Sequence, residues 1–216
     1  MSDPIVGFFD RRPRAYDIQL PLERHALRAA AALAQPLAGA RVVDLATGTG
    51  ALAAAVLARP GPVRSLTAVD ASPRMLERAR SRLGTAATLL LADARSVPLP
   101  DGSADVVTIG YLLHLLDPWA RADAIAEALR PLRPGGRLVA VVHGSPTGRA
   151  GQAYRAAWAL LARVASRAVV GGGPMADLAS CLAAAGLEVE VSRRVPGIYW
   201  TQVVRARRPG RGRAQR

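Results

Sequence analysis

Two aspartates and two glycines of this sequence have the types and the spacing of a ligand site. Asp44 lies in the apolar run Val42–Ala46, Gly48 and Gly50 follow that run, and Asp70 ends the next apolar run. Glycines let the chain turn sharply and bring its backbone close to a ligand. A strand, a glycine-rich turn, a helix and a second strand that ends in an acid indicate a nucleoside site at the carboxyl edge of a parallel sheet. The acid is expected to bind the ribose hydroxyls.

These residues are compatible with two nucleoside cofactors. Gly48, Gly50 and Ala53 match the loose fingerprint of NAD-binding proteins, so an NAD(P)-dependent oxidoreductase is one alternative. Asp44 would crowd an anionic pyrophosphate, but it suits a ligand that carries an ammonium and a sulfonium. All 29 basic residues are arginine, and the absence of lysine removes the Tyr-x-x-x-Lys pair of short-chain dehydrogenases. Together these features favour S-adenosyl-L-methionine as the cofactor.

Four motifs in order resemble those of class I S-adenosylmethionine-dependent methyltransferases, and within that group the ubiquinone/menaquinone C-methyltransferase family. They are VVDLATGTG at 42–50, LADA at 91–94 with VPLPD at 97–101, DVVTIGY at 105–111, and LRPGGRLV at 132–139. The resemblance is close over residues 40–143 and loose over 175–206, where GIYW at 197–200 falls near a family turn.

The chain departs from the quinone enzymes on the acceptor side. After Tyr111 it has Leu112-Leu113-His114-Leu115, where those enzymes usually have Gly-Leu-Arg-Asn. The segment FFD at 8–10 with Tyr16 resembles the family's opening, but other signals of that opening are missing. The resemblance therefore implies the methyl donor and does not imply a quinone acceptor.

The resemblance implies an α/β, Rossmann-like fold with a mostly parallel seven-stranded sheet flanked by helices, the last strand antiparallel. We expect one methyltransferase domain over 1–206, comprising N-terminal cap helices (1–38), a donor-binding half (39–143), an acceptor-side insertion (144–174), and a C-terminal helix with a strand pair (175–206). A disordered basic tail is expected over 207–216.

The resemblance also implies which residues contact the donor. Asp70 would bind the ribose, Asp93 and the backbone of Ala94 the adenine, and Tyr111 would lie beside the sulfonium. A turn aspartate and a core tyrosine remain the alternatives for Asp93 and Tyr111. The full predicted set is Asp44, Ala46, Thr47, Gly48, Gly50, Asp70, Ala71, Asp93, Ala94, Tyr111 and Tyr16; no metal site is predicted.

Local signals predict where the elements begin and end. Ser72-Pro73 and Asp117-Pro118 each combine a capping residue with a proline suited to the first helical turn, and the second helix should end near Leu129. Periodic apolar residues predict a helix over Leu22–Leu33, with Leu22 on its buried face. Predicted strands are Val42–Ala46, Leu66–Val69, Thr88–Leu91, Ala104–Ile109 and Leu138–Val142; a short helix is expected over Ala51–Ala58.

Two histidines are the candidate catalytic residues. His114 follows the fourth predicted strand and His143 ends the fifth, so both should face the ligand cleft. Histidine titrates near neutrality and can take a proton from a phenolic acceptor. For each of them a purely structural role is the alternative.

Residues 151–170 are expected to form a helix with an apolar stripe of Tyr154, Trp158, Leu161 and Ala165, ending at the glycines of 171–173. This stripe would either cover the acceptor or belong to the core. As a cover it would favour a small, flat and mainly apolar acceptor.

The formal net charge of +13 raises a nucleic-acid alternative. Six arginines lie between Arg205 and Arg216, but only 4% of the residues are aromatic and no base-methyltransferase signature follows the fourth predicted strand. We therefore expect a small-molecule acceptor. No apolar run approaches the length of a membrane span, and the N-terminus lacks a signal core, which predicts a cytoplasmic protein. Cys181 is interpreted as a small core residue.

Overall fold

The computed structural model describes residues 4–11, 13–146, 148–164, 174–175, 177–195 and 200–210. The side chains of residues 4, 8, 9, 11, 13–19 and 161–164 lie outside this description. Among the helices that it covers, none is long and apolar enough to cross a membrane.

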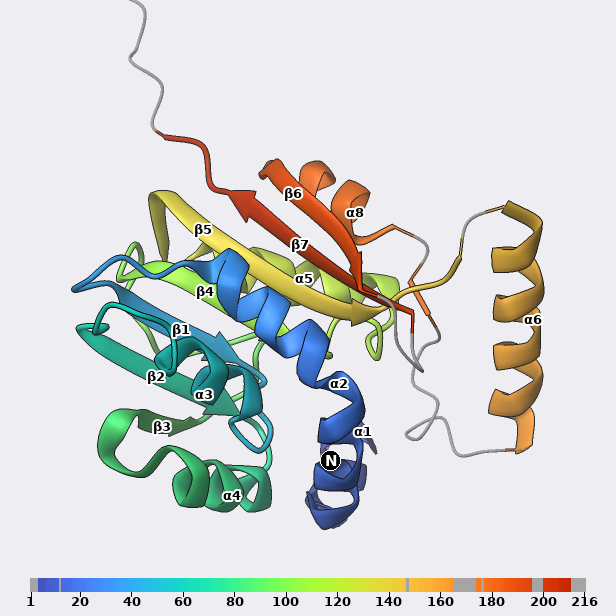
Figure 1. Ribbon diagram of the computed structural model, residues 1–216, viewed down its shortest axis with the longest axis horizontal. Helices are drawn as coiled ribbons and strands as arrows, with labels where there is room; N and C mark the ends of the chain where they lie inside the picture. Colours follow the sequence, from blue (N-terminus) through green and yellow to red (C-terminus); the bar gives the residue numbers. More distant parts are fainter. Residues whose placement is uncertain are drawn as a thin grey trace, which may run out of the picture.

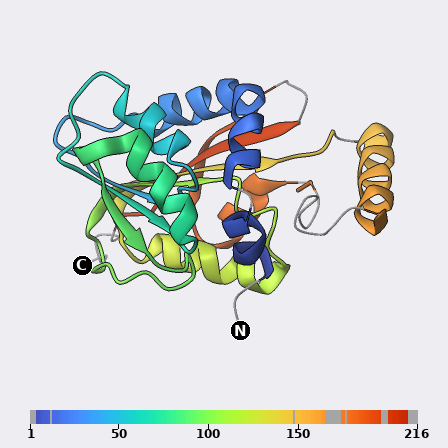
Figure 2. The same ribbon diagram turned by 90° about the horizontal axis from the view of Figure 1, so that it is seen from below.

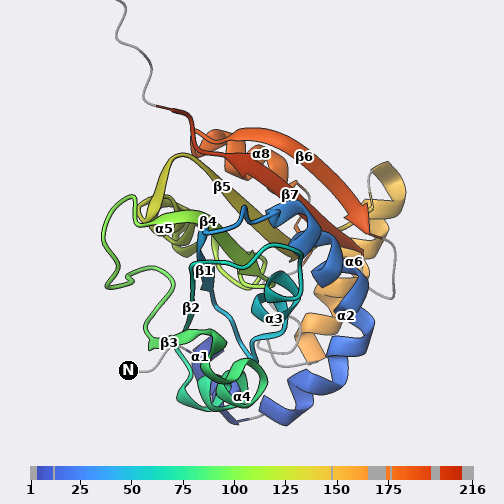
Figure 3. The same cartoon turned by 60° about the vertical axis from the view of Figure 1, so that its left-hand side comes forward.

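Seven strands form a single sheet in the order β3-β2-β1-β4-β5-β7-β6 (Figure 1). Their bounds are β1 Arg41–Leu45, β2 Ser65–Asp70, β3 Thr88–Leu91, β4 Ala104–Gly110, β5 Leu132–His143, β6 Glu188–Val195 and β7 Thr201–Arg207. The first five pair in parallel, whereas β7 runs antiparallel to both β5 and β6, as predicted. Figure 3 shows β3 and β6 at opposite edges of the sheet. The chain order reverses between β1 and β4, the position where such sheets bind ligands.

Helices cover both faces of this sheet (Figure 2). On one face lie α2 (Pro13–Ala34), α3 (Ala51–Leu57) and α4 (Pro73–Leu83); on the other lie α5 (Pro118–Leu129) and α8 (Leu178–Ala184). A short α1 (Pro4–Arg11) precedes α2, and α6 (Gly148–Val164) stands to one side of the sheet in Figure 1.

The central strands β4 and β5 are mainly apolar because both faces of the sheet are buried there. In β5, Val139 and Val141 pack toward α2, whereas Leu138, Ala140 and Val142 pack toward α5, and all five are fully buried. Successive side chains of a strand point to opposite faces. A strand covered on both faces therefore carries no polar alternation.

Ser72 and Asp117 cap the N-termini of α4 and α5, as predicted. The hydroxyl of Ser72 accepts a hydrogen bond from the Met75 N–H at 3.2 Å. The carboxylate of Asp117 accepts from the N–H groups of Trp119 and Ala120 at 2.9 and 3.0 Å. These bonds satisfy donors that the first turn of a helix leaves without partners.

The predicted start of the fifth strand is wrong by six residues, because β5 begins at Leu132 and not at Leu138. Its first part pairs Leu132 with Ala104, and the register then shifts before Arg137 pairs with Val106. The helix α5 ends at Leu129, before the Pro-Gly-Gly segment of residues 134–136, which lies inside β5 at the register shift and does not interrupt the sheet. Long-range pairing of this kind leaves no local signal in the sequence.

The predicted basic tail begins too early. Arg207 is the last residue of β7, and Arg208 exchanges backbone hydrogen bonds of 2.9 Å with Gly135 and Gly136. The Arg208 guanidinium also donates to the carbonyl oxygens of Leu129, at 2.7 Å, and of Leu132. Both arginines therefore belong to the folded body; residues 211–216 lie outside the described ranges.

Candidate active site

The turn between β1 and α3 is joined to β2 by a backbone hydrogen bond. The Thr47 N–H donates to the Val69 carbonyl at 2.8 Å. Gly48 and Gly50 adopt φ values of 54° and 79°, a left-handed backbone that glycine enters without a steric penalty. A Cβ on Gly50 would also lie only 3.1 Å from the Leu83 side chain. The glycine at position 50 is therefore required both by the backbone and by packing.

Asp70 lies at the carboxyl end of β2 and holds this turn in place. One carboxylate oxygen accepts from the Gly48 N–H at 2.8 Å and the other from the Ser72 N–H at 2.9 Å. Burial raises the pKa of Asp70. A carboxylate oxygen accepts more than one hydrogen bond, so both oxygens of Asp70 can also accept bonds from a ligand.

A pocket of about 780 Å³, including its open mouth, lies against Asp70. The carboxylates of Asp70 and Asp93 supply its acidic groups, and α1 and α4 contribute apolar walls through Ile5, Val6 and Met75. An apolar pocket with a few fixed polar groups is the usual form of a cofactor site. The predicted residues Ala46, Gly48, Ala71, Ala94 and Tyr111 also line it.

Asp93 is held by its neighbour Arg95. One carboxylate oxygen accepts from the backbone N–H and the Nε of Arg95 at 2.8 and 2.9 Å, and the other from Nη2 at 2.6 Å. These bonds lower the pKa of Asp93, which stays ionised at neutral pH. Arg95 also lines the pocket, although it was not among the predicted site residues.

Asp44 lies under the glycine turn and is buried. Its two oxygens accept from the hydroxyls of Thr47 at 2.6 Å and Thr108 at 2.5 Å. Burial raises the pKa of Asp44 from 3.8 to about 6, and the nearby charge of Asp70 acts in the same direction. Asp44 lines a second, smaller pocket of about 270 Å³.

The two pockets meet at Ala46, Gly110 and Tyr111, which line both of them. This junction lies at the carboxyl ends of β1 and β4, where the strand order reverses. Ala46 and Tyr111 adopt φ values of 52° and 54°. A left-handed backbone at a residue other than glycine is strained, and such residues cluster at functional sites.

Tyr111, His114 and His143 form a cluster of rings beside the junction, which we call the ring cluster. The centroid of the His143 ring lies 4.8 Å from that of Tyr111 and 4.6 Å from that of His114. Burial lowers the pKa of His143 to about 4 and that of His114 well below its ordinary value. Nδ1 of His114 has no hydrogen-bond partner among the described residues. The structure thus brings the two predicted histidines together, in neutral form at pH 7.

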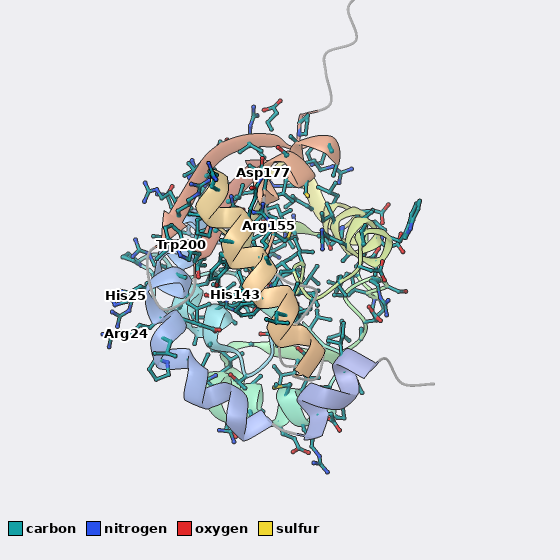
Figure 4. All side chains as sticks on the ribbon, turned by 90° about the vertical axis from the view of Figure 1, so that its right-hand side faces the viewer. Arg24, His25, His143, Arg155, Asp177 and Trp200 are labelled. Carbon is teal, nitrogen blue, oxygen red and sulfur yellow. The ribbon has the colours of Figure 1, made fainter. Side chains whose placement is uncertain are left out.

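Glu23 was not among the predicted site residues, but its carboxylate lies 4.0 Å from Nε2 of His143. Only 2% of Glu23 is exposed, whereas Leu22, predicted on the buried face of this helix, is 42% exposed. Glu23 lies three, four and seven residues before the buried Ala26, Leu27 and Ala30. It therefore shares their face of the helix, and assigning the buried face to these residues would have predicted that Glu23 is buried. Figure 4 looks onto this end of the sheet from the side of α6 and labels His143.

A second missed residue, Asp10, joins α1 to the pocket wall. Its carboxylate accepts from the Ser72 hydroxyl at 2.7 Å and lies 3.9 Å from the Arg74 guanidinium. Because Ser72 also binds Asp70 and caps α4, this contact holds α1 beside the donor pocket.

Some of the predicted residues, or their side chains, lie outside the described part of the chain. Tyr16 belongs to α2, but its side chain lies outside the described residues, as do residues 197–199 and the side chains of 161 and 165. Tyr154 and Trp158 lie side by side on α6, with ring centroids 6.0 Å apart. The Arg155 side chain joins α6 to the loop after β5 by donating to the Ser145 hydroxyl at 2.7 Å.

Comparison with known families agrees with this geometry. Residues 42–136 match the model of a methyltransferase domain. The ubiquinone/menaquinone biosynthesis C-methyltransferase of Stutzerimonas stutzeri is 34% identical over 152 residues, which are 68% of this chain and 54% of that protein. An uncharacterized methyltransferase of Mycobacterium bovis is 43% identical over 103 residues, covering 48% of this chain and 40% of that protein. Residues 42–136 belong to the class I S-adenosylmethionine-dependent methyltransferase family.

Solved structures share the fold of this methyltransferase. A putative methyltransferase bound to the Haloferax volcanii Trm112 activator superimposes with a TM-score of 0.75 at 19% identity, over 97% of this chain and 99% of that one. The 1,6-didemethyltoxoflavin-N1-methyltransferase of Burkholderia thailandensis, solved with its substrate and S-adenosylhomocysteine, gives 0.69 at 20% identity, over 97% and 92%. The methyltransferase spans about half the length of the curated relatives that it matches.

The two pockets fit the chemistry of the family's methyl donor. The larger one combines apolar walls with two carboxylates, which suits an adenosine. The smaller one contains the buried Asp44, whose anionic form needs a cation such as an ammonium. The family and these pockets favour S-adenosylmethionine over the NAD alternative.

Proposed function

We propose that this chain transfers the methyl group of S-adenosylmethionine to a small, mainly apolar acceptor with an aromatic or quinol-like ring. The observation that carries the proposal is the junction of the two pockets at Tyr111, with the ring cluster next to it. A donor that fills both pockets would have its sulfonium at the junction, and an acceptor beside Tyr111 would be in line with it.

The donor's adenosine would occupy the larger pocket. Asp70 would accept both ribose hydroxyls, and Asp93 with the backbone of Ala94 would receive the adenine amine. Ala71 is the predicted neighbour of the ribose. Support comes from the carboxylates of Asp70 and Asp93, which line the same pocket and are both fixed by hydrogen bonds.

The donor's methionine would occupy the smaller pocket. Asp44 would bind its ammonium, while Thr47, Gly48 and Gly50 present backbone around it; Tyr16 is a further predicted contact. The donor supplies an already activated methyl group. The chain therefore has to position the acceptor and, for an acidic acceptor, to remove its proton.

An apolar acceptor agrees with the ring cluster beside the junction, where the buried rings of Tyr111 and His114 adjoin the ring of His143. The curated relatives are named for methylation of ubiquinone and menaquinone precursors, and the Burkholderia enzyme for a flat heterocycle. We propose that α6, with Tyr154 and Trp158, covers this acceptor.

Calorimetry with S-adenosylhomocysteine and with NAD tests the donor site directly. We expect heat from S-adenosylhomocysteine and none from NAD, and the opposite result would reject the proposed function. Labelled S-adenosylmethionine with quinols, phenols, amines and RNA then tests the acceptor. Methylation restricted to RNA would favour the nucleic-acid alternative.

A further inference from the structure

A buried carboxylate faces the ring cluster from α2. Glu23 is 2% exposed, and its Oε1 lies 4.0 Å from Nε2 of His143. That separation is within ion-pair range and beyond hydrogen-bond reach. Pro21, just before Glu23 in α2, lacks a backbone donor, and α2 changes direction along its length in Figure 1. The helix thereby directs a charge toward the ends of β4 and β5.

Burying a carboxylate is costly unless a cation or hydrogen bonds compensate for it. His143 is a neutral base at pH 7, and burial alone makes it a weak one. A proton on His143 would give Glu23 a counter-charge, and Glu23 would stabilise the resulting imidazolium. At a separation of 4.0 Å, each of the two groups therefore stabilises the charged form of the other.

The other charged or titratable groups described near His143 do not provide the negative charge that Glu23 provides. Tyr111, whose pKa is raised by burial and by Glu23, stays neutral. His114 is neutral, and Arg121 on α5 acts on it with a positive charge. Thr201, which pairs with His143 across β5 and β7, does not titrate. Among the described neighbours, Glu23 is the group with a negative charge.

We propose that Glu23 and His143 form a proton-accepting pair that selects acceptors with an acidic hydroxyl, such as phenols and quinols. His143 is the catalytic residue of the pair and Glu23 its positioning residue. This inference rests on the proposed function, since it assigns the acceptor class and the base of the same site.

In the step that the pair serves, the acceptor's O–H bond breaks and its proton goes to the His143 imidazole. The electron pair of that oxygen forms the bond to the methyl carbon, and the electrons of the broken C–S bond remain on sulfur. The products are a methyl ether, a neutral thioether and an imidazolium paired with Glu23. The positive charge moves from sulfur to His143, so the step is balanced.

The test compares Glu23→Gln and His143→Asn with matched controls on exposed residues, Glu77→Gln and His25→Asn. The acceptor probes are 1-naphthol, 1,4-dihydroxynaphthalene and 1-naphthylamine. For the two hydroxyl probes we expect kcat to fall about 10- to 100-fold in Glu23→Gln and about 10²- to 10⁴-fold in His143→Asn, with KM nearly unchanged. The controls should match the wild type.

Two readouts separate this role from a structural one. The S-adenosylhomocysteine dissociation constant should stay within about twofold of the wild type in both variants, since neither residue lines a donor pocket. Nitrogen-detected NMR of the histidines, without acceptor, should show His143 titrating at lower pH in Glu23→Gln than in the wild type.

An unchanged His143 titration in Glu23→Gln overturns the inference, and this readout decides even if no probe is methylated. The inference is also overturned if 1-naphthylamine is methylated in preference to the hydroxyl probes and Glu23→Gln changes KM. In that case Glu23 would bind a cationic acceptor. If Glu23→Gln does not fold, Glu23→Asp, which keeps the charge, should retain the His143 titration, and loss of that titration would contradict the pair. A wild-type protein that binds no S-adenosylhomocysteine would instead reject the proposed function.

Discussion

The phenol ring of Tyr111 and the imidazole of His143 lie 4.8 Å apart with their planes inclined by 36°. Tyr111 follows β4, and His143 is the last residue of the adjacent parallel strand β5; the two strands pair up to Gly110 and Val141. Tyr111 lines both pockets, whereas His143 lines neither. Tyr111 is therefore the residue through which the proposed donor site adjoins the proposed acceptor site.

Replacing Asp70 with alanine should weaken the binding of S-adenosylhomocysteine about 10- to 100-fold. The ribose hydroxyls would lose charged acceptors worth about 1.5–3 kcal/mol, and the Gly48 and Ser72 N–H groups would lose theirs. Calorimetry measures the loss, with Asp123→Ala, an exposed site on α5, as the control. Equal affinities in the two variants would count against the pocket assignment.

Donor affinity should rise as the pH passes through about 6, the pKa to which burial raises Asp44. Only the ionised carboxylate attracts the ligand's ammonium. At pH 5 about nine-tenths of Asp44 is protonated, so binding should be about tenfold weaker than at pH 7.5. Calorimetry across this range should show the trend in the wild type and a flat response in Asp44→Asn. A wild-type affinity that does not vary with pH would contradict the prediction.

Asp44 also makes the stability of the ligand-free protein depend on pH, but here the stability falls as the pH rises. Because the folded-state pKa lies above 3.8, Asp44 stabilises the fold most below about pH 4. This contribution is lost as the pH rises through about 6. Two pKa units correspond to about 3 kcal/mol. Urea unfolding at pH 4.5 and 7 should therefore show a smaller loss of free energy in Asp44→Asn than in the wild type.

Gly50→Ala should destabilise the protein more than Gly39→Ala. Both glycines have a φ of 79°, so alanine suffers the same backbone penalty of about 1–2 kcal/mol at either site. A Cβ at position 39 meets no atom within 4 Å, whereas at position 50 it meets Leu83 at 3.1 Å and the Ala79 backbone at 3.3 Å. We expect about 1–3 kcal/mol more loss at Gly50 in urea unfolding. Equal losses would show that the crowding relaxes without cost.

A chain ending at Gly210 should keep the melting temperature and donor affinity of the full chain, since the contacts of Arg208 remain. A chain ending at Ala206 loses Arg207 and Arg208, with several hydrogen bonds worth about 1 kcal/mol each. Its melting temperature should fall by about 5–10 °C. Donor affinity or turnover that vanishes already on ending at Gly210 would instead assign a function to the last six residues.

The sequence alone determined the fold and the donor-side candidates, because the relevant signals are local. Each of these signals is contained in a stretch of a few residues. They are the glycine turn, the helix caps at Ser72 and Asp117, and the apolar strands. The acid at position 70 follows its strand directly. Such signals survive without a partner segment, since they reflect backbone conformation, hydrogen bonding to near neighbours, and burial on both faces of a sheet.

Only the tertiary structure decided the surroundings of the acceptor side. Glu23 and His143 are far apart in the chain, and they meet because α2 packs across the ends of strands that come later. The early part of β5 and the contacts of Arg208 depend in the same way on partners distant in sequence. Burial then lowers the pKa of His143 and raises that of Asp44, and these shifts arise from how much water the folded chain excludes.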